Sequence, residues 1–400
     1  MENKLRLDLN NVKQELKLLI EILKFDNGHT PSSYKSDRSI DWETFLSLAK
    51  HHRIYPQIFL KADENQQIQI PSQIINRLKK AYQKNTIKML HLTHEMESLN
   101  SLLLKENVRM LFLKGPVLAD DLYGDISRRT SSDIDVLIPI DELDRVHDLL
   151  VDCGYVKDDY ISTVLSDWKW RHHHVAYFHP EKRVKLEVHW RLNPGPGPEP
   201  NFNDLWNRKR VSNITPSPSY YLGREDLLLF LISHGARHGW SRLRWVVDIH
   251  QLFQNQSEEL DWTLIFKLSK KYYSYQIVGQ ALLLSANLFG TELNKEMDPL
   301  IKSRKAVELS QNTVFYFENM VNLHTEPLPE EVAKYHKRYL FLLKTFRQKT
   351  LFILSFLFPY SDDADTLPLP KSLHFLYFPL RPFLWFWRKT KKLHALNRGI

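Results

Sequence analysis

Apolar side chains recur at helical spacing through the first hundred residues of the chain. Leu16, Leu19 and Leu23 fall three or four positions apart, which places them on one face of a helix. A second and longer helix is predicted over residues 72–106, where polar and apolar positions continue to alternate with the same period. We therefore expect residues 1–106 to form a helical N-terminal region.

After residue 106 the pattern changes to short apolar stretches that are separated by turns. Alternating or continuous apolar positions predict strands at 109–113, 133–139, 175–178 and 184–192. A helix is predicted over 141–153, because Gly154 supplies a typical helix end. Residues 107–205 are thus expected to form a small α/β core, of α+β type, with a mixed sheet between two helical regions.

The rest of the chain reads as helical, and we expect a helical domain over residues 206–365. The tail, residues 366–400, combines Phe, Trp, Lys and Arg with no acidic residue. We expect it to pack on the body formed by the preceding regions. An interfacial membrane segment has a similar composition, so weak membrane-surface contact is the alternative, although Pro379 and Pro382 are expected to break any long helix.

Composition places the chain among globular proteins, with 43% hydrophobic and 26% charged residues. We expect a cytoplasmic protein, because the N-terminus lacks the apolar core of a signal peptide, Cys153 is the single cysteine, and no apolar run is long enough to span a membrane. The formal net charge of +8 suits anionic partners such as nucleotides. No recognised nucleic-acid motif appears, which favours a small molecule or a peptide as a further partner.

Two carboxylates on one predicted strand are the strongest candidates for chemistry. Asp133 and Asp135 are two positions apart, so their side chains share one face of the strand. Neighbouring carboxylates repel each other unless they share a cation, and Mg²⁺, or Mn²⁺ in its place, would relieve that repulsion. Glu187 and His189 share a face of another predicted strand, and strand pairing would add Glu187 as a third metal ligand.

These residues, in this order, resemble the polymerase-beta-like nucleotidyltransferase superfamily. More narrowly, the chain is similar to a bacterial family of uncharacterised nucleotidyltransferases over roughly residues 85–250. The resemblance rests on several short motifs: Leu113-Lys114-Gly115, Leu122-Tyr123, Arg128, Asp133-Ile134-Asp135, Gly154-Tyr155, Glu187-Val188-His189-Trp190, His234-Gly235, His238, Trp240, Leu243, Trp245 and Asp248.

The resemblance implies transfer of a nucleotidyl group from a nucleoside triphosphate to an acceptor hydroxyl, with release of pyrophosphate. Asp133, Asp135 and Glu187 would bind the metal ions, and Glu187 would help to deprotonate the acceptor. The acceptor itself is not indicated by the sequence.

The turn before the Asp pair departs from the superfamily pattern, which has Gly-Ser there. In this chain the turn is Lys114-Gly115-Pro116, so Lys114 would act as a cationic phosphate ligand and Gly115 would allow close backbone approach. Arg128 and Arg129 precede the Asp strand and would neutralise phosphate charge.

Histidines and an aromatic cluster complete the candidate site. One of the three consecutive histidines at 172–174 is expected to face the carboxylates, with His174 and His189 as supporting residues, whereas a zinc site there is disfavoured. His234 and His238 share a helical face. With Trp240, Arg242 and Arg244 nearby, they would either form a base-stacking or acceptor pocket or pack against the sheet. Asp248 is expected to pair with an arginine near it in sequence.

Two other functions use the same residues. The fold could move a sugar or phosphoryl group from a nucleotide donor onto a peptide or small metabolite. Alternatively, the chain could bind a nucleotide without turning it over.

Overall fold

The N-terminal region is helical, as the periodicity predicts. The computed structural model describes residues 5–24, 40–65, 68–158, 161, 163–254 and 259–397, with side chains as far as residue 390. Its first helices are α1 (Gln14–Lys24), α2 (Trp42–His51), α3 (Tyr55–Glu64) and the long α4 (Ser72–Lys105). The last of these matches the helix predicted over 72–106.

A mixed seven-stranded sheet forms the centre of the fold, in the order β3-β4-β5-β2-β1-β7-β6. The strands are β1 (Leu111–Phe112), β2 (Asp133–Leu137), β3 (Val156–Lys157), β4 (His174–His179), β5 (Val184–His189), β6 (Arg210–Ser212) and β7 (Ser219–Tyr221). β2 is parallel to β5 and β1 is parallel to β7, while the other neighbours are antiparallel. The α/β fold class expected from the sequence is confirmed.

The sheet extends further along the chain than the pattern predicts. β6 and β7 lie beyond residue 205, in a stretch assigned to the helical domain, and each has only three residues. Strands this short contain too few positions to show a two-residue period. The prediction that residues 206–365 are helical is therefore wrong at this pair of strands.

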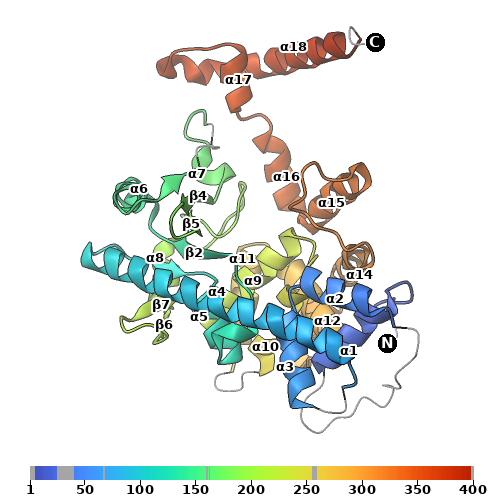
Figure 1. Cartoon of the computed structure of the whole chain (residues 1–400). Helices are drawn as coiled ribbons and strands as arrows, with labels where there is room; N and C mark the ends of the chain where they lie inside the picture. Colours follow the sequence, from blue (N-terminus) through green and yellow to red (C-terminus); the bar gives the residue numbers. More distant parts are fainter. Residues whose placement is uncertain are drawn as a thin grey trace.

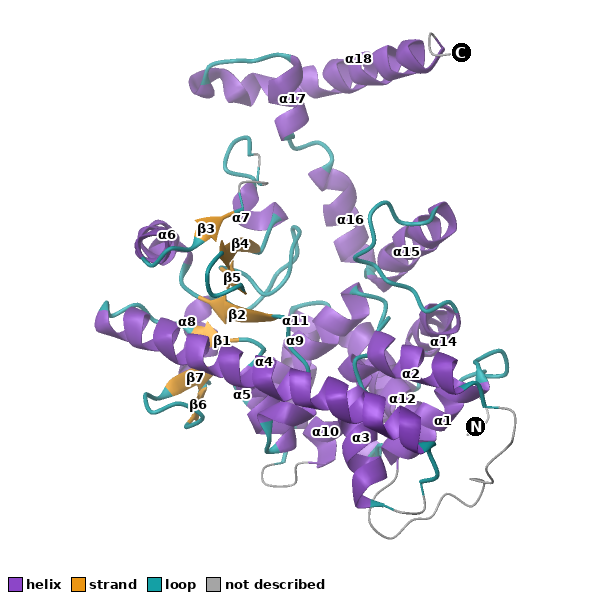
Figure 2. Ribbon diagram, viewed as in Figure 1, coloured by secondary structure: helices purple, strands orange, loops and turns teal. Residues whose placement is uncertain are grey.

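One face of the sheet is closed by helices. Ile134 and Val188 belong to an apolar cluster with residues of α4 and of α6 (Leu143–Asp152), including Met96 and Leu150. The shorter connecting helices are α5 (Pro116–Tyr123), α7 (Trp168–Arg171) and α8 (Phe202–Asn207). Figure 2 shows the strands gathered in one part of the molecule, beside α4. The other face of β2 and β5 is left for polar side chains.

The two helical regions, which are far apart in sequence, share one apolar core. The later helices are α9 (Arg224–Arg237), α10 (Leu243–Gln254), α11 (Trp262–Lys271), α12 (Tyr275–Phe289), α13 (Asp298–Ile301), α14 (Arg304–Glu318) and α15 (Glu330–Leu343). Leu19 of α1 and Phe45 of α2 are buried in the same cluster as Leu282 of α12. The helices before and after the sheet therefore form one body.

The C-terminal arm, residues 346–397, projects from this body (Figure 1). It contains α16 (Phe346–Ser355), α17 (Ser361–Thr366), a 3₁₀ segment (Lys371–Leu376) and α18 (Tyr377–Asn397). The expectation that the tail packs on the body is wrong for most of its aromatic side chains, because they are exposed. The expected break at the prolines is also wrong: α18 continues through Pro382, and Pro379 lies in the first turn, where no helical N–H is needed.

Candidate functional site

Two neighbouring strands place acidic side chains opposite each other. β2 and β5 run parallel, and their register pairs Asp135 with Glu187 and Asp133 with Lys185. Ile134 points to the opposite face, into the core with α4. The two-residue period of a strand therefore puts both aspartates and Glu187 on the polar face of the sheet.

Asp135 is fully buried at the centre of this face. Its Oδ1 lies 2.9 Å from Nζ of Lys114 and 3.4 Å from Nε2 of His189. Burial on its own would raise the pKa of Asp135, but the Lys114 ammonium and the His189 ring outweigh it and lower the pKa. The group is therefore a carboxylate at neutral pH.

Glu187 is half-buried and surrounded by cationic or potentially cationic groups. Its Oε1 lies 2.7 Å from Nζ of Lys185, and its Oε2 lies 3.6 Å from Nε2 of His189 and 3.9 Å from Nε2 of His174. Burial opposes ionisation, yet the contacts with these neighbours lower the pKa of Glu187. Asp135 and Glu187 thus face each other as two ionised groups.

Asp133 lies two residues before Asp135 on β2, and its pKa is shifted in the opposite direction. Burial and the negative charge of Asp135 raise its pKa, while Lys114 acts in the other direction. A divalent cation beside the pair would stabilise the ionised form of Asp133.

The ligand atoms of Asp135, Glu187 and His189 lie within 4.8 Å of one another, so these three groups could hold one metal ion. Both oxygens of Asp135 and both ring nitrogens of His189 are buried without a well-aligned hydrogen-bond partner among the described residues. Unsatisfied buried acceptors of this kind fit a cation. Asp133 lies outside this group of atoms, although its carboxylate is near enough to respond to the charges of Asp135 and Glu187.

Two of the three consecutive histidines face the site, where one was expected. His174 Nδ1 and His173 Nε2 are 3.2 Å apart, and the rings of both adjoin His189. Ligand atoms of these three histidines also lie within 4.8 Å of one another. Burial lowers the pKa of His174 to about 4, so its ring is neutral at physiological pH and able to bind a metal or accept a proton.

Comparison with known proteins identifies the family. The family described as "Uncharacterised nucleotidyltransferase" matches residues 38–290, which is more than half of the chain. The chain belongs to this family. The match begins just before α2 and ends just after α12, so the C-terminal arm lies outside it.

Other comparisons add little. No curated protein matches the chain. Among solved structures, the crystal structure of an antigenic nucleotidyltransferase-like protein from Paracoccidioides brasiliensis is 19% identical, with a TM-score of 0.28, over 47% of this chain and 92% of that one.

The Lys114-Gly115 turn of this nucleotidyltransferase-family chain lies directly beside the carboxylates. Gly115 has φ of 91°, a left-handed backbone conformation that L-residues rarely adopt, and it directly precedes α5. The turn presents Lys114 to Asp135. The lysine proposed as a phosphate ligand therefore already has a carboxylate partner.

The two arginines before the Asp strand have different locations from those expected. Arg129 is buried and forms two hydrogen bonds of 2.9 Å to Asp248, which leaves it enclosed rather than open to a phosphate. Arg128 is exposed and lies 3.8 Å from Glu64 of α3. The structure therefore gives Arg129 a structural role, and the partner of Asp248 is an arginine distant in sequence.

The predicted acceptor pocket is only partly assembled. His234 and His238 lie side by side with ring centroids 4.7 Å apart, and the ring of Trp245 contacts both. Trp240 does not join them, because it is fully buried against Gly235, where any Cβ would clash with its ring. Trp245 therefore takes the place expected for Trp240.

Arg244 supports the loop before β2 instead of lining a pocket. Its Nη1 donates to the carbonyl oxygen and to Oγ1 of Thr130, three residues before Asp133. Burial lowers the pKa of Arg244 to about 9. We assign it to positioning this loop.

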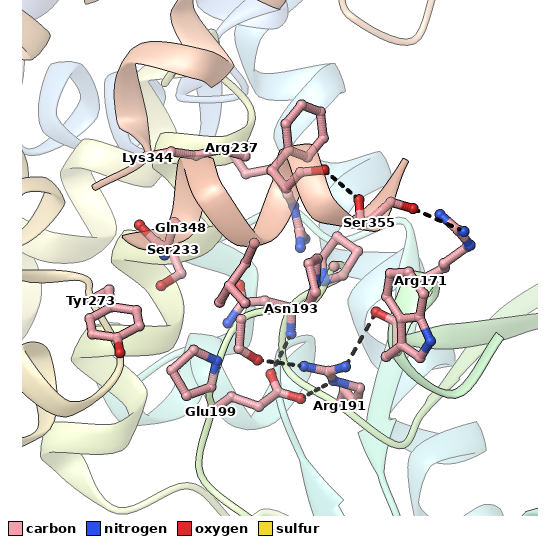
Figure 3. A pocket seen from close by; sticks show the side chains of 18 of the residues that line it. Arg171, Arg191, Asn193, Glu199, Ser233, Arg237, Tyr273, Lys344, Gln348 and Ser355 are labelled. Atoms are coloured by element: carbon pink, nitrogen blue, oxygen red, sulfur yellow. Dashed lines mark hydrogen bonds and ion pairs between the residues drawn. The ribbon is translucent and has the colours of Figure 1, made fainter. Parts of the chain in front are cut away.

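A cavity of about 590 Å³ lies beside the ends of β4 and β5 (Figure 3). It is enclosed by the loop at residues 193–199, by α7 and α9, and by α15 and α16. The loop is held in place by Glu199, which pairs with Arg191 and accepts hydrogen bonds from the N–H groups of Leu192 and Asn193. The carboxylates themselves do not line this cavity.

Arg237 connects the cavity with the carboxylates, and the sequence analysis missed it. It lines the cavity, and its Nη1 is buried without a hydrogen-bond partner among the described residues. Burial lowers the pKa of Arg237 to about 10 in spite of the opposing charges of Glu187, Glu199 and Asp135. Its position three residues after His234 on the same helix is the signal that could have indicated it.

Proposed function

We propose that the chain transfers a nucleotidyl group from a nucleoside triphosphate to an acceptor hydroxyl. The observation that carries this proposal is the facing pair of Asp135 and Glu187 on β2 and β5. Asp135 is fully buried without a well-aligned hydrogen-bond donor among the described residues, and Glu187 is half-buried beside Lys185. Family membership supports nucleotidyl transfer in general. The polymerase-beta-like pattern in the sequence supports the specific reaction, which is transfer from a nucleoside triphosphate to a hydroxyl.

Asp135, Glu187 and Asp133 would hold Mg²⁺, or Mn²⁺ in its place, with His189 adjoining. The bound cation would stabilise the negative charge on the phosphates and on the attacking oxygen. In the reaction, the acceptor oxygen forms a bond to the α-phosphorus, and the bond from the α-phosphorus to the bridging oxygen breaks. Pyrophosphate leaves with that electron pair, and Glu187 takes up the acceptor proton.

Cationic side chains near the site would bind the triphosphate. Lys114 is available for this role once a divalent cation has replaced it at Asp135. Arg237 offers a buried Nη1 without a partner, close enough to interact with the charge of Glu187. Both residues would neutralise charge that develops on the leaving group.

We assign the acceptor to the adjacent cavity. A volume of about 590 Å³ suits a small molecule or a short peptide segment, which typically occupy sites of several hundred cubic ångströms. Its wall contains four cations, Arg171, Arg191, Arg237 and Lys344, and two acids, Asp167 and Glu199, which pair with Arg171 and Arg191. The positive charge in excess comes from Arg237 and Lys344, so an acceptor that also carries negative charge fits best.

The test is pyrophosphate release by the full chain with Mg²⁺, each of ATP, GTP, CTP and UTP, and a panel of acceptors. The double variant Asp133→Asn/Asp135→Asn and the single variant Glu187→Gln should lose at least about 100-fold in rate, since each removes charge from the metal-binding site. The exposed Asp148→Asn on α6 is the matched control and should retain full rate.

Other products would contradict the proposal. Release of a nucleoside diphosphate would instead support transfer of a phosphoryl group, or of a sugar when a nucleotide sugar is the donor. Nucleotide binding that needs no metal and yields no product would indicate a binding protein.

A further inference from the structure

Exposed aromatic side chains are concentrated on the C-terminal arm. In the part of the chain that the structure describes, ten Phe and Trp side chains are exposed, and eight of them belong to the arm. They are Phe346, Phe356, Phe375, Phe378, Phe383, Trp385, Phe386 and Trp387. So many exposed aromatic side chains on one segment are unusual and mark a site of interaction.

The helix α18 has one face fixed to the arm and one face open. On the inner face, Tyr377 and Leu384 are buried with Val164, which lies between β3 and α7. Arg381 and Arg388 pair with the buried carboxylate of Asp363 on α17. These contacts fix the rotation of the helix about its axis, which decides which side chains point outward.

The outer face of α18 carries the largest exposed aromatic groups. Phe383 is 73% exposed, Phe386 64% and Trp387 57%. Nζ of Lys389 lies 4.4 Å from the ring centre of Trp385, on the same exposed part of the helix. The outer face thus combines large apolar rings with a cation at its margin.

Charge is distributed just as unevenly. Residues 346–400 contain nine Lys or Arg and three Asp, so this segment supplies +6 of the formal net charge of +8. Residues 366–400 contain no acidic residue, and Asp363 is neutralised by the two arginines of α18. The C-terminal arm as a whole is therefore positively charged, with Lys389 on the exposed part of α18, which favours an anionic partner surface.

We propose that the outer face of α18 binds an anionic membrane surface. Phe and Trp rings suit the headgroup region of a bilayer, and Lys and Arg beside them contact lipid phosphates. No described helix is both long and apolar enough to cross a membrane, so the helix would lie in the plane of the surface. Because α18 continues through Pro382, its exposed rings from Phe378 to Trp387 lie on one continuous helix.

The arm is attached to the cavity, so membrane binding would also orient the body. Nη2 of Arg171 donates to the carbonyl oxygens of Ser355, Phe358 and Pro359, and its guanidinium lies 3.8 Å from the ring centre of Tyr360. Residues of α16 form part of the cavity wall. Docking of α18 would therefore hold the cavity close to the lipid surface.

The experiment is flotation of the full chain with vesicles of phosphatidylcholine alone and with vesicles that also contain phosphatidylglycerol. The wild-type chain should float with the anionic vesicles and remain in solution with the neutral ones. The double variant Phe383→Ser/Phe386→Ser should bind at least about tenfold more weakly, because two exposed rings no longer enter the headgroup region. Phe178→Ser changes an exposed Phe of the sheet and is the matched control.

A second variant separates charge from apolar contact, and folding is checked independently. Lys371→Glu/Lys389→Glu should weaken flotation with anionic vesicles by a similar factor, and added salt should weaken binding of the wild type. Because every changed side chain is exposed, thermal unfolding should be unaffected.

Three results would overturn the proposal. The wild-type chain could remain in solution with anionic vesicles, or the Phe variants could float as well as the wild type. Alternatively, size-exclusion chromatography could show a dimer that the Phe variants convert to a monomer, with no vesicle binding, which would mean that this face pairs two copies of the chain. All of these measurements are made without nucleotide and are independent of the proposed reaction.

Discussion

Nζ of Lys114 lies 2.9 Å from Oδ1 of Asp135, and this ion pair is largely removed from solvent. Replacing the lysine by Met leaves the buried carboxylate without its closest cation, which should cost about 3–5 kcal/mol of unfolding free energy in metal-free buffer. Mg²⁺ should restore part of that loss if it binds beside Asp135. Urea unfolding with EDTA and with Mg²⁺ measures both effects.

Lys185→Met is the matched control for this prediction. Lys185 pairs with Glu187 but is about half exposed, so its loss should cost at most about 1 kcal/mol. Equal stability of Lys114→Met and the wild type in EDTA would show that the ion pair does not stabilise Asp135.

The buried and uncharged side chain of His52 should make the folded protein less stable in mild acid. His52 is fully buried, and burial, together with the nearby His51 and Arg242, holds its pKa well below its ordinary value of 6.5. The unfolded chain therefore takes up a proton near pH 6.5 that the folded protein does not, so stability is lost as the pH falls below that value.

The variant His52→Gln should reduce the slope of unfolding free energy against pH below 6.5 by up to about 1.4 kcal/mol per pH unit. Chemical unfolding at a series of pH values gives this slope. An unchanged slope in His52→Gln would contradict the assignment.

Arg129 and its exposed neighbour provide a direct comparison of buried and surface charge. Among the described residues, Arg129→Met leaves Asp248 with the hydroxyl of Tyr123 as its one side-chain hydrogen-bond donor, at 2.8 Å, and should cost about 3–5 kcal/mol. Arg128→Met removes a side chain that is 44% exposed and 3.8 Å from Glu64, and should cost less than about 1 kcal/mol. Guanidinium unfolding compares the two. Similar costs would argue against a structural role for Arg129.

Gly115 should resist substitution for a conformational reason. An added Cβ would meet the carbonyl oxygen of Asp133 at 3.7 Å, which is ordinary contact, but φ of 91° is strained for any residue with a side chain. Gly115→Ala should therefore cost about 1–3 kcal/mol and displace Lys114 from Asp135. Thermal unfolding would be compared with Gly197→Ala, where φ is not in the left-handed region and no atom lies within 4 Å of an added Cβ.

Local periodicity was sufficient to predict the elements that carry the carboxylates. The alternation at Asp133–Leu137 and Val184–His189 places the acids on one face, and their convergence then depends on a single strand pairing. The long helix α4 was equally clear, because its pattern extends over many turns.

Contacts between residues distant in sequence could not be predicted in this way. Arg129 reaches Asp248 across 119 positions, and no local pattern links them. The burial of Trp240 could not be predicted locally either, because its ring packs against Gly235 in space that a Cβ would occupy. For the tail, packing on the body was the first expectation and membrane-surface contact the alternative, because Phe and Trp side chains are usually buried within the chain itself.

The shared core of the first and later helices has a consequence for synthesis on the ribosome. Leu7 donates its N–H to the side chain of Asn287, and Leu19 is buried among residues of α12. While the chain is being translated, the apolar faces of α1 and α2 have no complete partner until α12, which ends at Phe289, has been made. Nascent chains should therefore remain clients of holding chaperones until α12 has emerged, and translation pauses before α12 should promote aggregation.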